Sequence, residues 1–321
     1  MVTPAEAATT LPAYRGRFAP SPTGPLHFGS LVAAVGSYLD ARHHGGQWLI
    51  RIEDVDRPRC PPGADDALLR LLDAYGFERD GEVLWQSRRD ALYDDALEIL
   101  RANHVVFACA CTRSELAAAS HGRRACDGAP LYPGNCRHGL PPGRAPRAWR
   151  MRVNDTTIGF DDLFRGRISQ NLARDVGDFV LKRADGLFAY QLAVVVDDAA
   201  QGITHIVRGA DLLDSTPRQI FLQQHLGIST PVYAHLPLVI NETGEKLSKQ
   251  TRAAPLSADT IAPTLLSALR FLGQNPPGEM EAASPGEIWQ WAIAHWTRAA
   301  VPRENGRMNG MWLNPPDEVG E

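Results

Sequence analysis

Residues 20–30, which read PSPTGPLHFGS, combine a histidine and glycines at a point where a helix is predicted to begin. The first turn of a helix offers unpaired N–H groups and about half a positive charge, so it can bind a phosphate. Gly24 and Gly29 allow a ligand to approach the backbone, and His27 can donate to a phosphate oxygen. The segment lacks the G-x-x-x-x-G-K-[ST] pattern of a P-loop. A Pro/Gly turn with a capping histidine is the plain alternative.

A second segment, residues 246–250, reads KLSKQ and follows Gly244. Lys246 and Lys249 flank a small polar residue, and a Gly-bearing loop of this kind can close on a polyphosphate. The two ammonium groups would neutralise charge that develops during phosphoryl chemistry. Taken alone, the segment could equally be a solvated surface loop.

A third group of residues could bind a metal. Cys109, Cys111 and Cys136 lie close together in the sequence, and three thiols in a loop-rich stretch suggest structural zinc with four tetrahedral ligands. The spacing is not a standard C-x-x-C pair, and buried thiols without a metal are the alternative. Four nearby residues could supply the fourth ligand: Cys126, His121, His138 and Tyr132.

The elements that must position these residues alternate in type along the first hundred residues. Residues 15–19 could form a short strand, and apolar residues recur at helical spacing over 28–43. Residues 48–52 alternate as a strand, with Arg51 and Glu53 on one face, and amphipathic helices are predicted over 68–75 and 91–102. The order strand, helix, strand, helix favours a parallel sheet with crossover helices. Further along, a hairpin is predicted over 179–196 with its turn at Asp185-Gly186, followed by a strand over 201–208 and a helix over 213–226.

The order of these predicted elements also indicates the domain organisation. Residues 1–14 form a flexible tail, and residues 15–256 form the main α/β unit. Residues 105–150 hold four of the five cysteines and interrupt the alternation, so they are predicted to be an insertion with its own stabiliser. Residues 257–321 form a short helical C-terminal region.

Composition narrows the class of protein. Hydrophobic residues make up 44% and the net charge is −4, which is ordinary for a globular protein and argues against a general nucleic-acid-binding coat. Residues 121–152 contain seven arginines and one acid, Asp127. This basic segment forms either a solvated loop or a face that contacts phosphates. No apolar run approaches the length of about 20 residues that spans a bilayer, so no membrane is expected. Five cysteines suit the reducing cytoplasm.

Together, the H-x-G segment and the K-x-S-K loop resemble the two signature motifs of class I aminoacyl-tRNA synthetases. Residues 17–24 (RFAPSPTG), 51–57 (RIEDVDR) and 207–212 (VRGADL) resemble the glutamyl subgroup. The resemblance runs from about residue 15 to about residue 255. It implies a Rossmann-type catalytic domain of the α/β class, here with a zinc-bearing insertion.

The chain ends soon after the KLSKQ loop, where glutamyl-tRNA synthetases continue into an anticodon-binding region, and KLSKQ replaces the commoner K-[ML]-S-K-[RS]. Both features resemble the glutamyl-Q tRNA(Asp) synthetase family. The resemblance implies activation of L-glutamate with ATP and Mg²⁺, and esterification of the queuosine at the wobble position of tRNA(Asp). It also implies a cytoplasmic monomer without an anticodon-binding domain.

The resemblance assigns roles to residues of this sequence. His27 and Lys249 are the expected catalytic residues, and His27, Gly29, Lys246 and Lys249 are expected to bind ATP. The expected glutamate-binding residues are Arg17, Phe18, Ala19, Pro20, Ser21, Glu53, Tyr190 and Arg208. A guanidinium can bind a carboxylate through two hydrogen bonds, which suits Arg17 and Arg208, and Glu53 suits the ammonium. The family pattern C-x-C, then Y-x-x-x-C, gives one zinc per chain on Cys109, Cys111, Tyr132 and Cys136.

Three other functions are compatible with parts of this pattern. A minimal glutamyl-tRNA synthetase would charge the 3′ end of tRNA(Glu), and the position of glutamate on the tRNA separates it from the first interpretation. A non-catalytic synthetase-like protein would bind RNA without glutamate-dependent ATP–pyrophosphate exchange. A nucleotidyltransferase of the same fold would adenylylate a small metabolite, which the segments over 17–24 and 51–57 argue against.

Overall fold

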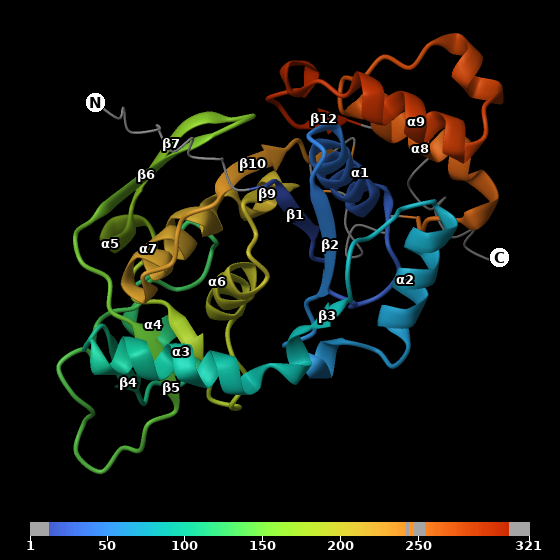
Figure 1. The fold of residues 1–321 in the computed structure, drawn as a ribbon. Helices are drawn as coiled ribbons and strands as arrows, with labels where there is room; N and C mark the ends of the chain where they lie inside the picture. The colour runs from blue at the N-terminus through green and yellow to red at the C-terminus, as the bar shows by residue number, and fades with distance from the viewer. Residues whose placement is uncertain (1–12, 242–243, 245, 247–253, 308–321) are drawn as a thin grey trace, which may run out of the picture.

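The computed structural model describes residues 13–241, 244, 246 and 254–307 (Figure 1). The N-terminal half contains a parallel sheet in the order β1-β2-β3, formed by Arg15–Phe18, Gln47–Ile52 and Leu84–Trp85. Helix α1 (Phe28–His43) connects β1 to β2, and α2 (Ala64–Ala74) lies between β2 and β3. The strand and helix that flank the first sequence motif therefore form as predicted.

A second sheet continues this layer. Its strand order is β7-β6-β10-β9, and β10 pairs in parallel with both β6 and β9. The backbone N–H of Thr204, just before β9, donates to the carbonyl oxygen of Arg15 at 2.9 Å, which sets β9 beside β1. The strand bounds are Thr157–Asp162 (β6), Gly166–Asn171 (β7), His205–Gly209 (β9) and Val232–Leu236 (β10). Helices pack on both faces of a largely parallel layer, as a Rossmann-type fold requires.

Two groups of helices cover this layer (Figure 1). Helix α1 packs against β1, β2 and β9, and carries α8 (Ile261–Phe271) and α9 (Pro285–His295) on its outer side. Helices α6 and α7 lie on the other side with α3. Their bounds are Tyr190–Ala200 (α6), Thr216–Leu226 (α7) and Asp90–Ala102 (α3). Each side encloses its own apolar core, and Phe28, Leu39 and Trp48 are fully buried in the first. Among the described helices, none has the length and apolar character needed to cross a bilayer.

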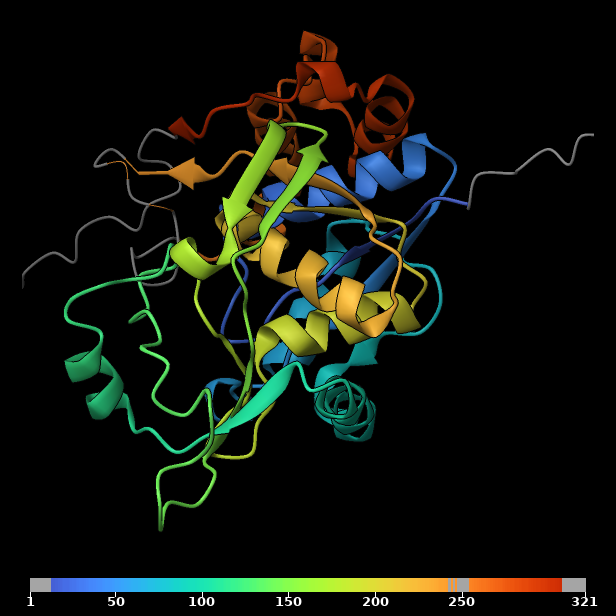
Figure 2. The ribbon, with the colours of Figure 1, turned by 90° about the vertical axis from the view of Figure 1, so that its left-hand side faces the viewer.

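Residues 105–150 form a lobe that joins the second apolar core through Val106, and they contribute two strands to an antiparallel sheet in the order β4-β5-β8. The three strands are Val106–Cys109, Ala148–Met151 and Val180–Lys182. Helix α4 (Arg113–Ala119) starts with a capping box in which Thr112 and Glu115 each accept from the other's backbone N–H. A short helix α5 (Leu172–Asp175) follows β7. Figure 2 shows this lobe and the C-terminal helices at opposite ends of the molecule.

Asp40 on α1 attaches the C-terminal region to the sheet. Its buried carboxylate accepts from Arg298 at 2.7 and 2.9 Å, from the indole N–H of Trp296 at 3.0 Å and from the hydroxyl of Tyr14 at 2.6 Å. Tyr14 also stacks on His205. The prediction that residues 1–14 form a loose tail is therefore wrong for Tyr14, while residues 1–12 lie outside the described part of the chain.

Further short elements complete the described structure. Strand β11 (Val239–Ile240) pairs in parallel with β12 (Gly306–Arg307), so the C-terminal region also contacts the segment after β10. Short 3₁₀ turns occupy Arg57–Arg59, Gln86–Arg88, Ala210–Ser215, Ala258–Thr260, Gly278–Ala282 and Arg298–Ala300.

The hairpin predicted over 179–196 forms only in part. The chain turns at Gly186 (φ 86°), and Phe188 makes an antiparallel bridge to Lys182. The predicted second strand is wrong, because residues from Tyr190 onward form helix α6. Four consecutive residues of α6, Leu192 to Val195, are buried. A helix that is buried on most of its faces has no clear polar face, so its apolar run resembles a buried strand.

Candidate active site and metal centre

A cavity of about 950 Å³ opens where the two sheets meet, at the carboxyl ends of β1, β2, β9 and β10 and beside the start of α1. Ligands bind at this place in open α/β sheets because the strand order reverses there and leaves a crevice. The cavity is lined by all the described residues that the sequence predicted for glutamate and ATP: Arg17, Phe18, Ala19, Pro20, Ser21, His27, Gly29, Glu53, Tyr190, Arg208 and Lys246. The predicted catalytic residue Lys249 lies outside the described residues.

The segment after β1 forms the floor of the cavity. The backbone N–H of Glu53 donates to the carbonyl oxygen of Pro20 at 2.9 Å, which joins this segment to the end of β2. His27 is the N-cap of α1, and its Nδ1 accepts from the backbone N–H of Ser30 at 3.3 Å. In the neutral ring this leaves the proton on Nε2, so that edge of the imidazole can donate to a phosphate oxygen.

Four buried charged groups form a network beside the cavity, which two of them, Arg17 and Glu53, line. The Nε of Arg17 donates to Asp198 at 3.1 Å, and Arg51 donates to Asp198 at 2.7 Å and to Glu53 at 3.0 Å. Burial alone would raise the pKa of Asp198, but the two guanidinium groups hold it below its usual range. Burial raises the pKa of Glu53, and Arg51 and Arg17 only partly offset that effect. The two positive and two negative charges balance one another.

Arg208, at the end of β9, has a different environment. Its buried guanidinium donates to His235 Nε2 at 3.1 Å, to Thr216 at 2.9 Å and to Gln219 at 2.8 Å, and contacts the hydroxyl of Tyr190 at 3.4 Å. Burial, and then the negative charge of Glu53, raise the pKa of Tyr190 to about 12, so its hydroxyl keeps its proton. In the part of the chain that the structure describes, no carboxylate lies within ion-pair distance of Arg208.

The two arginines assigned to carboxylate binding therefore differ in charge balance. Arg17 already contacts the carboxylate of Asp198, whereas the described partners of Arg208 are neutral. A buried charge without a counter-ion is unfavourable. A ligand carboxylate at Arg208 would remove that cost, so the cavity is suited to an anionic substrate.

Lys246 lies at the edge of the same cavity. Its ammonium forms an ion pair with Asp211 at 2.6 Å, and both side chains are partly exposed. Asp211 follows β9 in a 3₁₀ turn, so the ion pair connects the KLSKQ segment to the end of this strand. Phosphates that enter the cavity would meet this lysine.

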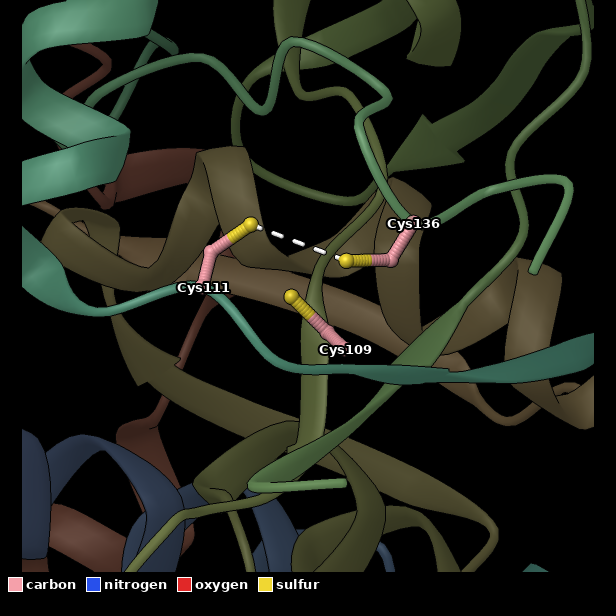
Figure 3. A group of neighbouring side chains, drawn as sticks. All are labelled: Cys109, Cys111 and Cys136. Carbon is pink, nitrogen blue, oxygen red and sulfur yellow. Dashed lines mark hydrogen bonds between the residues drawn. The ribbon is translucent and has the colours of Figure 1, made fainter. Parts of the chain in front are cut away.

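The three predicted thiols converge in the insertion (Figure 3). The sulfur atoms of Cys109, Cys111 and Cys136 all lie within 4.8 Å of one another. Burial, and then the neighbouring thiols, raise the pKa of Cys111 to about 12. A divalent cation would offset this cost, because it binds thiolates directly. The donor set and its spacing therefore fit zinc.

The structure separates the four candidates for the fourth ligand. The hydroxyl of Tyr132 lies 3.7 Å from Cys109 Sγ and accepts from the backbone N–H of Cys136 at 2.8 Å. Cys126 instead accepts a hydrogen bond from Gln170 at 3.3 Å and is exposed. Cys126, His121 and His138 do not belong to the group of ligand atoms around the three thiols. The geometry thus favours Tyr132.

Comparisons with known proteins identify the family of this chain. Residues 13–291 match the family described as tRNA synthetases class I (E and Q), catalytic domain. The glutamyl-Q tRNA(Asp) synthetase of Dechloromonas aromatica is 61% identical over 293 residues, which cover 91% of this chain and 97% of that protein. The protein of the same name from Neisseria meningitidis is 55% identical, covering 90% and 98%. The chain belongs to the glutamyl-Q tRNA(Asp) synthetase family.

Solved structures support the same fold for this member of the glutamyl-Q tRNA(Asp) synthetase family. A glutamate tRNA ligase from Elizabethkingia meningosepticum, in complex with its amino acid, has a TM-score of 0.76 and 27% identity, covering 92% of this chain and 67% of that chain. The glutamate-tRNA synthetase of Elizabethkingia anophelis has a TM-score of 0.78 and 26% identity, covering 93% and 68%. The predicted fold class, family and enzyme class are confirmed: this is an ATP-dependent ligase of class I.

Sequence reasoning missed the residues that support the site of this family member. For Arg51, the sequence predicts only that it shares a strand face with Glu53. This alternation of residues along the strand is the signal that could have identified Arg51 as a partner of Glu53. Asp198 carries no local signal, because it lies 147 residues from Arg51 on helix α6. His235, which holds Arg208, was also missed.

The arginines between residues 121 and 152 have several internal partners. Arg144 pairs with Glu115 at 3.0 Å, and Arg137 pairs with Asp178 at 3.2 Å. Arg150 lies over the ring of Tyr132 at 4.3 Å from its centre. These three side chains stabilise the insertion rather than forming a uniformly solvated loop.

Proposed function

We propose that this protein activates L-glutamate with ATP and transfers the glutamyl group to the queuosine at the wobble position of tRNA(Asp). The observation that carries the proposal is the cavity at the sheet junction, where Arg208 lacks a described carboxylate partner beside the His27 motif. The close relatives named for this reaction support the choice of tRNA substrate.

The first step joins glutamate to ATP. The α-carboxylate attacks the α-phosphorus of ATP, the bond to the β-phosphate breaks, and glutamyl-adenylate and pyrophosphate result. Arg17 and Arg208 would bind the carboxylates, and Glu53 would bind the ammonium, with Tyr190 and residues 18–21 shaping the pocket. This step needs no side-chain nucleophile, since positioning and charge stabilisation lower its barrier.

The two signature segments would bind the phosphates of ATP. His27, Gly29 and the first turn of α1 would bind the α-phosphate, because this turn offers N–H groups and positive potential. Lys246 would contact the phosphates after leaving Asp211, and Lys249 would hold the departing pyrophosphate. Mg²⁺ would accompany ATP and would neutralise part of the charge of its phosphates.

The second step transfers the acyl group. A hydroxyl of the queuosine cyclopentenediol attacks the carbonyl carbon of the adenylate, an ester forms, and AMP leaves. The hydroxyl proton passes to the phosphate of the released AMP or to water.

We propose a structural zinc on Cys109, Cys111, Tyr132 and Cys136, where it would tie the loops of the insertion together. We also propose a monomer that acts in the cytoplasm, the compartment of its tRNA.

The test uses two matched tRNA pools, one with queuosine and one without. Each is incubated with the protein, ATP, Mg²⁺ and labelled glutamate. Label in the queuosine-containing pool alone supports the proposal. Equal label in both pools indicates 3′-end charging by a minimal glutamyl-tRNA synthetase. If neither pool is labelled and glutamate-dependent ATP–pyrophosphate exchange is absent, the proposal is wrong.

A further inference from the structure

A chain of three buried side chains runs from strand β6 to the cavity. Asp162, at the end of β6, accepts from His235 Nδ1 at 2.6 Å, and His235 Nε2 accepts from Arg208 Nε at 3.1 Å. His235 and Arg208 sit on the paired strands β10 and β9, opposite one another in register. All three side chains are almost completely buried. Of the three, only Arg208 lines the cavity.

The surroundings of Asp162 determine the tautomer of the histidine. Its Oδ1 accepts from the backbone N–H groups of Phe164 at 3.0 Å, Arg165 at 2.9 Å and His235 at 3.1 Å. Burial alone would raise the pKa of Asp162, but the hydrogen bond from the His235 ring, followed by the backbone bonds from His235 and Arg165, holds it below its usual range. An ionised carboxylate can only accept, so the ring must carry its proton on Nδ1. The lone pair on Nε2 then faces the Nε–H of Arg208.

His235 is also neutral. Burial lowers its pKa to about 4. Asp162 acts to raise this pKa, and the positive charges of Arg208 and Arg165 offset part of that effect. The ring therefore orients Arg208 without cancelling its charge. An acid at this position would orient the guanidinium equally well but would neutralise it. Thr216 and Gln219 accept from Nη2, on the same edge of the guanidinium as Nε, and they are neutral as well.

We propose that His235 and Asp162 are positioning residues for substrate recognition, because they hold Arg208 in place through a neutral acceptor and leave its charge for a carboxylate of the amino acid. The inference rests on the proposed function and adds to it. It predicts that glutamate binding depends on which ring nitrogen of His235 carries the proton.

Asp162→Asn tests this dependence. The amide keeps the shape and can still accept from the backbone, but its NH₂ group would face Nδ1 and drive the ring proton to Nε2. Arg208 then loses its acceptor. We expect the glutamate KM in ATP–pyrophosphate exchange to rise about tenfold to hundredfold, the range for one hydrogen bond to a charged group. The KM for ATP should change less than about twofold.

The chain offers a matched control and a rescue. Asp161→Asn alters the neighbouring, exposed carboxylate, which pairs with Arg167, and should leave both KM values unchanged. His235→Asn can keep the bond to Asp162 but cannot reach Arg208, so it should behave like Asp162→Asn. His235→Gln places an acceptor near the former Nε2 and should recover most of the glutamate affinity, even if Asp162→Asn fails to fold.

A spectroscopic readout separates positioning from general damage. In protein with ¹⁵N-labelled histidine, the His235 signals should report the Nδ1–H tautomer in the wild type and the Nε2–H tautomer in Asp162→Asn. A changed tautomer with an unchanged glutamate KM would overturn the inference. So would an equal rise in the KM values for glutamate and ATP, or a His235→Gln variant no better than His235→Asn. A wild type without glutamate-dependent exchange would instead refute the proposed function.

Discussion

Replacing Arg208 with glutamine should reduce glutamate activation far more than it affects ATP binding. The guanidinium is buried, its described partners are neutral, and it is expected to meet a substrate carboxylate. Removing one partner of a buried, hydrogen-bonded charge pair costs about 3–5 kcal/mol. At about 1.4 kcal/mol per factor of ten, kcat/KM for glutamate should fall by roughly 10²- to 10⁴-fold.

The assay is glutamate-dependent ATP–pyrophosphate exchange with Arg208→Gln, compared with the wild type at several ATP concentrations. Arg79→Gln is the matched control, because Arg79 pairs with Asp73 on the surface, away from the cavity. Thermal unfolding checks that Arg208→Gln is folded. A fall in kcat/KM of less than about tenfold, or an equal loss of ATP affinity, would show that Arg208 does not bind the amino acid.

Three further predictions follow from other parts of the molecule. Lys249→Ala should abolish adenylate formation while circular dichroism stays unchanged, and an unaltered exchange rate would contradict its role. Cys136→Ala should release the one zinc ion expected per chain, whereas Cys126→Ala should retain it, as elemental analysis would show; a wild type without zinc would refute the metal site. Asp40→Asn should lower the free energy of unfolding by about 3 kcal/mol in urea, because it removes the buried charge that pairs with the partly exposed Arg298. Burial raises the pKa of Asp40, but hydrogen bonds from Arg298 and Tyr14 bring it below its usual value. This stabilisation should therefore be complete above about pH 4 and be lost as the pH falls further. Equal stability of Asp40→Asn and the wild type at pH 7 would contradict this prediction.

Much of the site could be predicted because its signals are local. His27 caps the helix that begins one residue later, and the predicted strand and helix on either side of that motif both form. The spacing of Cys109, Cys111 and Cys136 likewise indicated a shared site before the structure placed their sulfur atoms together. In these cases the chemistry depends on residues that are neighbours in the chain.

Prediction was weaker where burial on several sides hides the periodicity. The apolar residues at the start of α6 resemble a strand, yet they form a helix enclosed by α7 and α3. The sequence around Tyr14 predicts a loose tail, because nothing in its neighbourhood indicates a partner at Asp40. Contacts across the fold determine both outcomes.

The sequence alone was enough to locate the segments proposed to bind phosphate and metal, the residues proposed to face the amino acid, and the resemblance to a synthetase family. Only the tertiary structure decided how the charges are paired. Asp198, on a helix far away in the chain, pairs with both Arg17 and Arg51, and His235 holds Arg208 without neutralising it. A charged group in the interior must find partners, and those partners come from whichever elements the fold brings against it. For that reason, the sequence indicates which side chains enter the cavity, and the fold determines which of them keeps its charge for the substrate.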